Sequence, residues 1–134
     1  IRGEPSEEAL ALARRTERAD VRILLALTDR GARVAIDGAW FEPRGGPRVG
    51  LERRPVLQRA LAALAVAGPG TLVRRDELIA AAWPGERMTP ASADARLHAT
   101  IRALRRLGLG QVLWTGEIVG DLGYGLARDV LVLR

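Results

Sequence analysis

Hydrophobic residues between residues 21 and 52 occur in short runs that are broken by turn-forming residues. The runs cover residues 22–27, 33–37, 39–42 and 48–52. The breaks contain Asp-Gly and Gly-Gly-Pro sequences, which favour tight turns between antiparallel strands. The pattern therefore predicts an antiparallel β-meander, with Trp40 and Phe41 in the core or on a sheet face.

Three segments with helical spacing follow. Residues 55–67 begin with a proline and stop at a Gly-Pro-Gly sequence, and residues 75–83 stop at Pro84-Gly85. Residues 90–107 have Thr89 as N-cap and end at Gly108. The apolar stripes of these helices predict one shared core, made of Leu57, Leu61, Leu64, Leu78, Ile79, Trp83, Leu97, Ile101 and Leu104.

The two ends of the chain have different patterns. Residues 5–19 have Ser6 as a candidate N-cap and acids ahead of arginines, so residues 1–20 are expected to form a helix or a lead-in from an upstream domain. The opening Ile indicates a fragment of a longer chain. Residues 111–133 return to strand character around a Gly-rich turn, which predicts a terminal hairpin anchored by Trp114. The expected fold class is α+β, with one domain over residues 21–134 that contains a meander at 21–52, helices at 55–107 and a hairpin at 111–133.

The composition removes several classes of function. The chain has no Cys, which excludes disulfides and thiolate chemistry, and no apolar stretch long enough for a membrane span or signal peptide. His98 is the single histidine, so a partly buried or hydrogen-bonded side chain is expected rather than a metal ligand. We expect a cytoplasmic protein that is not an enzyme and has no cofactor, no metal and no small-molecule substrate.

Arginine supplies all of the positive charge. The net charge is +5, and every one of the 21 basic residues is Arg. Arg suits phosphate and base-edge recognition, but GC-rich coding accounts for the composition equally well. Residues 51–134 contain the excess, with twelve Arg against eight acids. The position of the charge is therefore more informative than its total.

The helix at 90–107 separates into two faces. Ala93, Leu97, Ile101 and Leu104 recur at helical spacing and predict a buried stripe. The opposite side combines small residues with arginines, and Arg96 stands at its margin; the set is Ser92, Ala95, Ala99, Arg102, Ala103 and Arg106. Small side chains let a helix approach a DNA groove closely, while Arg reaches phosphates or guanine edges. A solvated Arg/Ala face is the alternative interpretation.

Several sequence strings carry a family resemblance. RPVLQRALAAL, TLVRRDELIAAAWPG, IRALRRLG and GDLGYGL occur in the order found in the OmpR/PhoB-type winged-helix domain, which residues 32–128 resemble. The strings DGAWFEPRGGPRVGLERRPVLQRALAAL, ELIAAAWPGERMTPASADARLHATIRALRRLGL and GYGL more closely resemble a winged-helix-like domain appended to multidomain regulators and ATPases of myxobacteria.

The OmpR-type resemblance implies a function. It makes residues 75–83 and 90–107 a helix-turn-helix pair, the second helix a major-groove reader and residues 120–123 the tip of the wing. The implied DNA contacts are Arg87, Thr89, Ser92, Arg96, Ala99, Arg102, Arg105 and Arg106. The sequence departs from the family in two places, the wing and the reading helix. Gly120 and Asp121 stand where the wing usually has Arg, and Ala103 stands where the reading helix often has a basic residue.

The expected function is therefore that of the DNA-binding module of a response regulator-like transcription factor. Double-stranded DNA is the expected partner, with a second copy of the chain or an upstream regulatory domain as further partners. The alternative is a winged-helix module for protein interaction or dimerisation, in which Arg96, Arg102 and Arg106 pair with acids. The loss of the wing arginine favours that alternative.

Overall fold

A computed structural model of the chain describes residues 31–134, and the expected helix at 5–19 and strand at 22–27 lie outside the described residues. The helices and strands confirm an α+β fold. In chain order they are β1 (Arg33–Ala35), β2 (Trp40–Glu42), β3 (Val49–Gly50), α3 (Pro55–Ala67), β4 (Leu72–Arg74), α4 (Arg75–Ala82), α5 (Pro90–Leu104), the π-helical turn η1 (Arg105–Leu109), β5 (Leu113–Ile118), β6 (Asp121–Leu126) and β7 (Leu131–Leu133).

The first sheet has the strand order β3-β2-β1-β7. Its first three strands form the predicted antiparallel meander, with Val34 opposite Phe41 and Phe41 opposite Val49. The assignment of residues up to 133 to the terminal hairpin was wrong, because β7 pairs in parallel with β1. A turn closed by the hydrogen bond from Val130 N–H to the Ala127 carbonyl directs the chain away from the hairpin. Buried Val130 and the bond from Leu131 N–H to the Ala32 carbonyl then fix β7 against β1.

The second sheet has the order β4-β6-β5, so β4 adds a third strand to the predicted hairpin. Val119 and Gly120 alone connect β5 to β6, and the expected tip at 120–123 was wrong, since residues 121–123 belong to β6. Both connecting residues have positive φ, 51° and 78°, as a two-residue hairpin turn of the mirror-image type requires. A Cβ on Gly125 would lie 2.5 Å from the Thr71 carbonyl oxygen, so this glycine allows the chain leading into β4 to approach β6.

The helices begin where the sequence predicts and differ slightly at their ends. α3 has the expected bounds, and α4 stops one residue early, with Trp83 as C-cap. The regular part of α5 ends at Leu104, and η1 carries the chain through Gly108, whose φ is 145°. A Cβ on Gly108 would lie 2.6 Å from the Pro43 ring. The glycine therefore ends the helix and admits the β2–β3 connection beside it.

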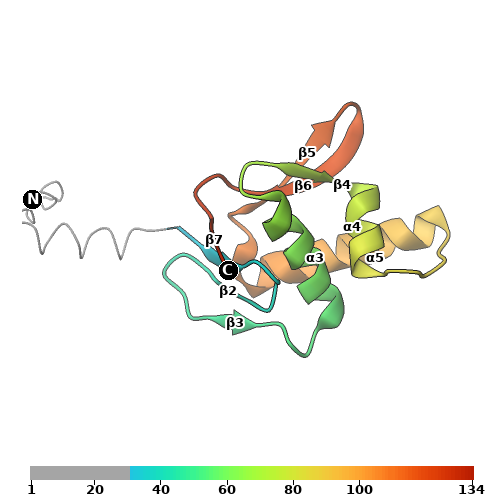
Figure 1. The fold of residues 1–134 in the computed structure, drawn as a ribbon. Coiled ribbons are helices and arrows are strands. Elements are labelled where there is room, and N and C mark those ends of the chain that lie inside the picture. Colours follow the sequence, from blue (N-terminus) through green and yellow to red (C-terminus); the bar gives the residue numbers. More distant parts are fainter. Residues whose placement is uncertain (1–30) are drawn as a thin grey trace, which may run out of the picture. The chain divides into compact units, whose positions relative to one another are not determined.

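α3 lies between the two sheets, α4 packs beside β4 and β6, and α5 crosses behind α3 (Figure 1). Seven of the nine predicted core residues are buried, while Leu57 and Ile79 are partly buried at the edge of the core. The sheets contribute further buried residues, among them Phe41, Leu51, Leu113, Tyr124 and Leu126. No helix within residues 31–134 combines the length and the apolar content that crossing a bilayer requires.

The three tryptophans have different environments. Trp83 is buried, as predicted, and Trp40 is half-buried with the Arg48 guanidinium stacked 3.7 Å from its ring centroid. The prediction that Trp114 anchors the hairpin was wrong, since this side chain is 55% exposed. Successive residues of a strand point to opposite faces, so burial of Leu113 turns Trp114 outward.

Thr89 is the N-cap of α5, as predicted. Its hydroxyl oxygen accepts a hydrogen bond of 3.1 Å from the Ser92 N–H, and Pro90 occupies the first turn. We expect Thr89→Ala to lower the free energy of unfolding by about 1 kcal/mol, because a helix N–H loses its acceptor. Thr89→Ser, which keeps the oxygen, serves as the control in urea denaturation. Equal losses in the two variants would contradict a capping role.

Candidate nucleic-acid interface

One side of α5 faces solvent, and the opposite side forms part of the core. Ala93, Leu97, Ile101 and Leu104 are buried, which confirms the predicted inner stripe. The outer side is an exposed stripe continued by η1, and we call it the α5 face. Its members are Ala91, Ala95, Arg96, His98, Ala99, Arg102 and Arg106. Ser92 and Ala103, which were expected on this face, are half-buried at its borders.

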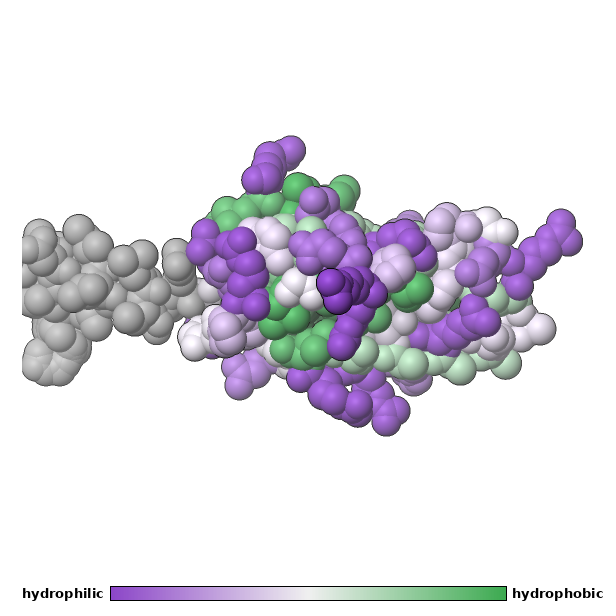
Figure 2. All heavy atoms as spheres, turned by 90° about the horizontal axis from the view of Figure 1, so that it is seen from below, coloured by the Kyte–Doolittle hydropathy of each residue, from purple (hydrophilic) through white to green (hydrophobic). Residues whose placement is uncertain are grey.

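The arginines of the α5 face differ in their ionic contacts. Arg96 pairs with Glu86 at 3.1 Å, whereas Arg102 and Arg106 make no ion pair within residues 31–134. Hydrophilic side chains are spread around apolar areas on the surface that Figure 2 shows, so charge density alone does not identify an interface. Other described arginines, such as Arg59 in α3, also lack an ion pair, so α5 differs in the small exposed residues that stand beside its arginines.

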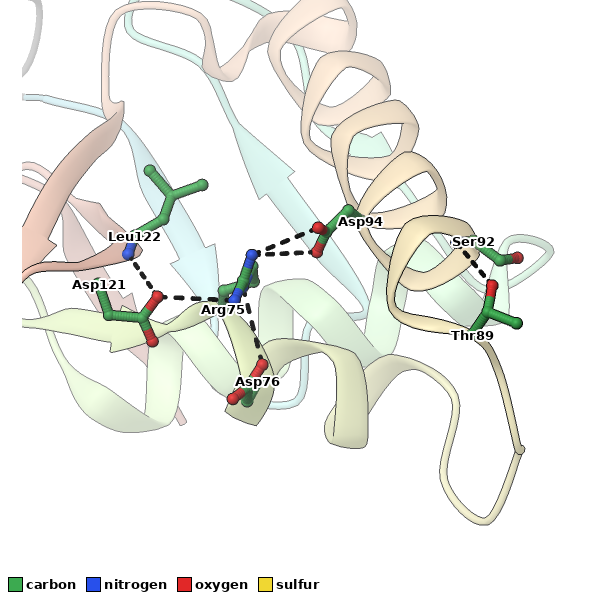
Figure 3. A network of polar contacts seen from close by, with 7 residues as sticks. All are labelled: Arg75, Asp76, Thr89, Ser92, Asp94, Asp121 and Leu122. Carbon is green, nitrogen blue, oxygen red and sulfur yellow. Dashed lines mark hydrogen bonds and ion pairs between the residues drawn. The ribbon is translucent and has the colours of Figure 1, made fainter.

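The single acid of α5 is neutralised by a neighbouring helix. Arg75, at the start of α4, places Nη1 3.3 Å from both carboxylate oxygens of Asp94 (Figure 3). Without this contact, the Asp94 carboxylate would repel a polyanion at the α5 face. The Asp94 carboxylate is therefore not an unpaired negative charge beside the α5 face.

Arg75 also connects the helices to the hairpin. Its Nη2 lies 3.7 Å from Asp121 Oδ1 in β6, and its Nε lies 3.7 Å from Asp76 Oδ1. Asp121 Oδ1 additionally accepts a hydrogen bond from the Leu122 N–H at 2.8 Å. The sequence interpretation had placed Asp121 at the hairpin tip, but this carboxylate points at α4 instead (Figure 3).

Arg105 has a different environment from the other predicted DNA contacts. Its Nε and Nη2 donate to the Leu113 carbonyl at 3.1 and 2.9 Å, and Nη2 also donates to Thr115 Oγ1 at 2.8 Å. The guanidinium is thus fixed against β5 without a carboxylate partner. The other predicted residues lie along α5, in η1 and in the connection before α5; they are Arg87, Thr89, Ser92, Arg96, Ala99, Arg102 and Arg106.

A hollow of about 260 Å³ lies between α5, η1 and the β5–β6 hairpin. Its lining residues are His98, Ile101, Arg102, Arg105, Thr115, Leu122 and Tyr124, a set without a carboxylate. Burial raises the pKa of the Tyr124 phenol above 10, although the charge of Arg105 opposes this shift. Thr115 and Tyr124 were not predicted as site residues, because only the packed hairpin brings them to the end of α5.

His98 and the carboxylates offer no metal centre in the described part of the chain. No group of three or more His, Cys, Asp or Glu side chains within residues 31–134 is placed to hold a metal ion. The expectation that His98 is partly buried or hydrogen-bonded was wrong, since it is exposed at the rim of the hollow and has no hydrogen bond within these residues. His98 follows the buried Leu97 and is rotated by about 100° around the helix, so its side chain lies just outside the core.

Comparison with protein-family models, with curated proteins and with solved structures finds nothing that matches this chain. The α+β architecture and the chemistry of the α5 face and the hollow are therefore the observations on which a function can be argued.

Proposed function

We propose that the chain is a winged-helix module of a transcriptional regulator that binds duplex DNA and has no catalytic role. In this proposal α4 and α5 form the helix-turn-helix pair, α5 enters the major groove, and the β5–β6 hairpin is the wing. The α5 face is the observation that carries the proposal. It combines small exposed residues with Arg102 and Arg106, two arginines that have no ionic partner within residues 31–134.

The geometry of the α5 face suits close approach to a groove. Ala91, Ala95 and Ala99 are exposed on successive turns, so no long side chain keeps the helix backbone away from base edges. Arg102 and Arg106 follow one turn apart on the same side and extend toward phosphates or guanine edges. Arg87 adds an exposed cation in the connection before the helix.

The tip of the hairpin is expected to add little to DNA affinity. Its tip residues Val119 and Gly120 carry no charge, and the nearby Asp121 carboxylate is directed at Arg75. A wing arginine that reaches into the minor groove is therefore missing from this chain. We expect modest affinity unless a second copy or another domain supplies further contacts.

Salt dependence tests the proposal most directly. We expect the affinity of the full chain for a labelled duplex, measured by fluorescence anisotropy, to fall linearly with salt on a double logarithmic plot. Arg102→Ala and Arg106→Ala should each flatten the slope by about 0.9 where the Arg neutralises a phosphate. An Arg that reads a base should instead cost about 1 to 3 kcal/mol and relax preference at one base pair.

Arg128→Ala is the matched control, because it removes the same charge from the exposed connection between β6 and β7. It should leave the salt slope unchanged. Undetectable duplex binding at low salt would refute the DNA proposal, as would a variant lacking Arg96, Arg102 and Arg106 that binds as well as the parent. The same arginines would then be assigned to acidic partners on another protein.

A further inference from the structure

Arg105 is a preorganised cation at the hollow between α5, η1 and the hairpin. Two of its nitrogens are committed to the Leu113 carbonyl and Thr115 Oγ1, and these bonds hold the guanidinium in one position. Its third nitrogen, Nη1, has no hydrogen-bond acceptor within the described residues. Arg102, which also lines the hollow, has no ionic partner there either. The lining residues therefore contribute two positive charges and no carboxylate, and the charge of opposite sign that acts on Tyr124 comes from Asp94.

Two hydroxyl groups add hydrogen-bond donors to these cations. Tyr124 is only 2% exposed, yet its phenol lines the hollow and makes no hydrogen bond to any residue in the range 31–134. Since burial raises its pKa, the phenol keeps its proton at neutral pH. Thr115 Oγ1 accepts from Arg105, which leaves the Thr115 hydroxyl proton available to donate.

The arrangement of these donors selects the shape of a ligand. Arg102 lies on α5 and Arg105 on η1, while Thr115 in β5 and Tyr124 in β6 are opposite each other in the hairpin, so the donors face the hollow from two sides. A planar carboxylate has two oxygens in one plane, whereas a tetrahedral oxyanion presents oxygens in all these directions.

We propose that this hollow binds one phosphate group, with Arg102 and Arg105 as its charge partners and the hydroxyls of Thr115 and Tyr124 as donors. This phosphate group could come from either of two sources. The first is free phosphate or a phosphate monoester, and the second is a phosphodiester of duplex DNA. Phosphate binding at this site does not require that the chain bind DNA.

Inorganic phosphate is the probe. We expect saturable amide shifts at Thr115 and Tyr124 when the full ¹⁵N-labelled chain is titrated with phosphate at constant ionic strength. Tyr124→Phe keeps the ring in the core and removes one donor to a charged ligand, so the dissociation constant should rise about tenfold. Thr71→Val, which removes an exposed hydroxyl outside the hollow, is the matched control and should leave it unchanged.

A parallel titration with chloride measures the amide shifts that general charge screening causes. Shifts that do not saturate, shifts that chloride reproduces, or a Tyr124→Phe variant with parental phosphate affinity would each overturn the proposal. An unaltered melting temperature of Tyr124→Phe establishes that the fold is intact in the comparison.

Duplex DNA distinguishes the two sources. A tenfold loss of DNA affinity in Tyr124→Phe, with competition by inorganic phosphate, would support the site and assign it to the DNA backbone. Saturable phosphate binding with unchanged DNA affinity would support the site and assign it to a free phosphate. Phosphate binding without any DNA binding would leave the site standing and remove the proposed function.

Discussion

Replacing Gly38 by alanine should lower the free energy of unfolding by about 2 to 5 kcal/mol, as measured by chemical denaturation. Gly38 has φ 72°, which costs an L side chain about 1 to 2 kcal/mol. An added Cβ would also lie 2.1 Å from the Gln58 carbonyl oxygen and 2.8 Å from the Ala62 nitrogen. Both atoms belong to the backbone of α3, so relief requires the β1–β2 turn or the helix to move, at a further cost of about 1 to 3 kcal/mol.

Gly45 provides a matched control for the backbone strain. Its φ is 70°, but a Cβ there would meet no atom within 4 Å. Gly45→Ala should therefore cost only the conformational part, about 1 to 2 kcal/mol. The difference between the two variants measures how tightly the turn packs against α3. Equal losses would show that the turn does not press on the helix.

Ile101→Ala is expected to cost about 2 to 5 kcal/mol in the same measurement. Ile101 is 1% exposed on the inner side of α5, where it belongs to the core with Leu97 and Leu104. Truncation removes buried apolar surface and leaves a cavity that the surrounding residues fill only in part. The result also bears on the α5 face, because burial of Ile101 fixes which side of the helix carries Arg102.

Val66→Ala, on α3, is the control for Ile101→Ala. Val66 is 71% exposed, so its truncation should change the free energy of unfolding by no more than about 0.5 kcal/mol. A comparably small loss in Ile101→Ala would contradict the burial of Ile101 and the orientation of α5.

The helices could be predicted from the sequence because their signals are local. In α3 the leucine spacing, the proline at the start and the glycine after the end all lie within the segment itself. The same holds for α5, where Thr89 caps the helix and the apolar spacing predicts the inner stripe. The buried stripe of a helix also fixes which residues are exposed on its opposite side, so the α5 face could be predicted from the same spacing.

The partners of the strands could not be predicted in the same way. Alternation identified residues near β7 as a strand, but it contains no information on whether β6 or β1 is the neighbour. The addition of β4 to the hairpin depends on glycines in β6 that admit a close backbone, a feature that in the sequence resembled a turn.

Only those parts of the candidate site that depend on a single helix could be predicted from the sequence. Arg102 and Arg106 were identified from helical spacing alone. Arg75 meets Asp94 and Asp121, and Arg105 meets Thr115, only once separate elements have packed together. The Arg-rich composition is expected both for a polyanion partner and for GC-rich coding. The neutralisation of Asp94 and the hollow between α5, η1 and the hairpin are properties of the tertiary structure.

The parallel pairing of β7 with β1 has a consequence for how the molecule is made. β1 leaves the ribosome early, but its partner β7 follows only after all three helices and the hairpin have been synthesised. Until then β1 presents an open edge on which another nascent chain can add a strand. Since joining distant segments slows folding, the last step of assembly is expected to be the insertion of β7.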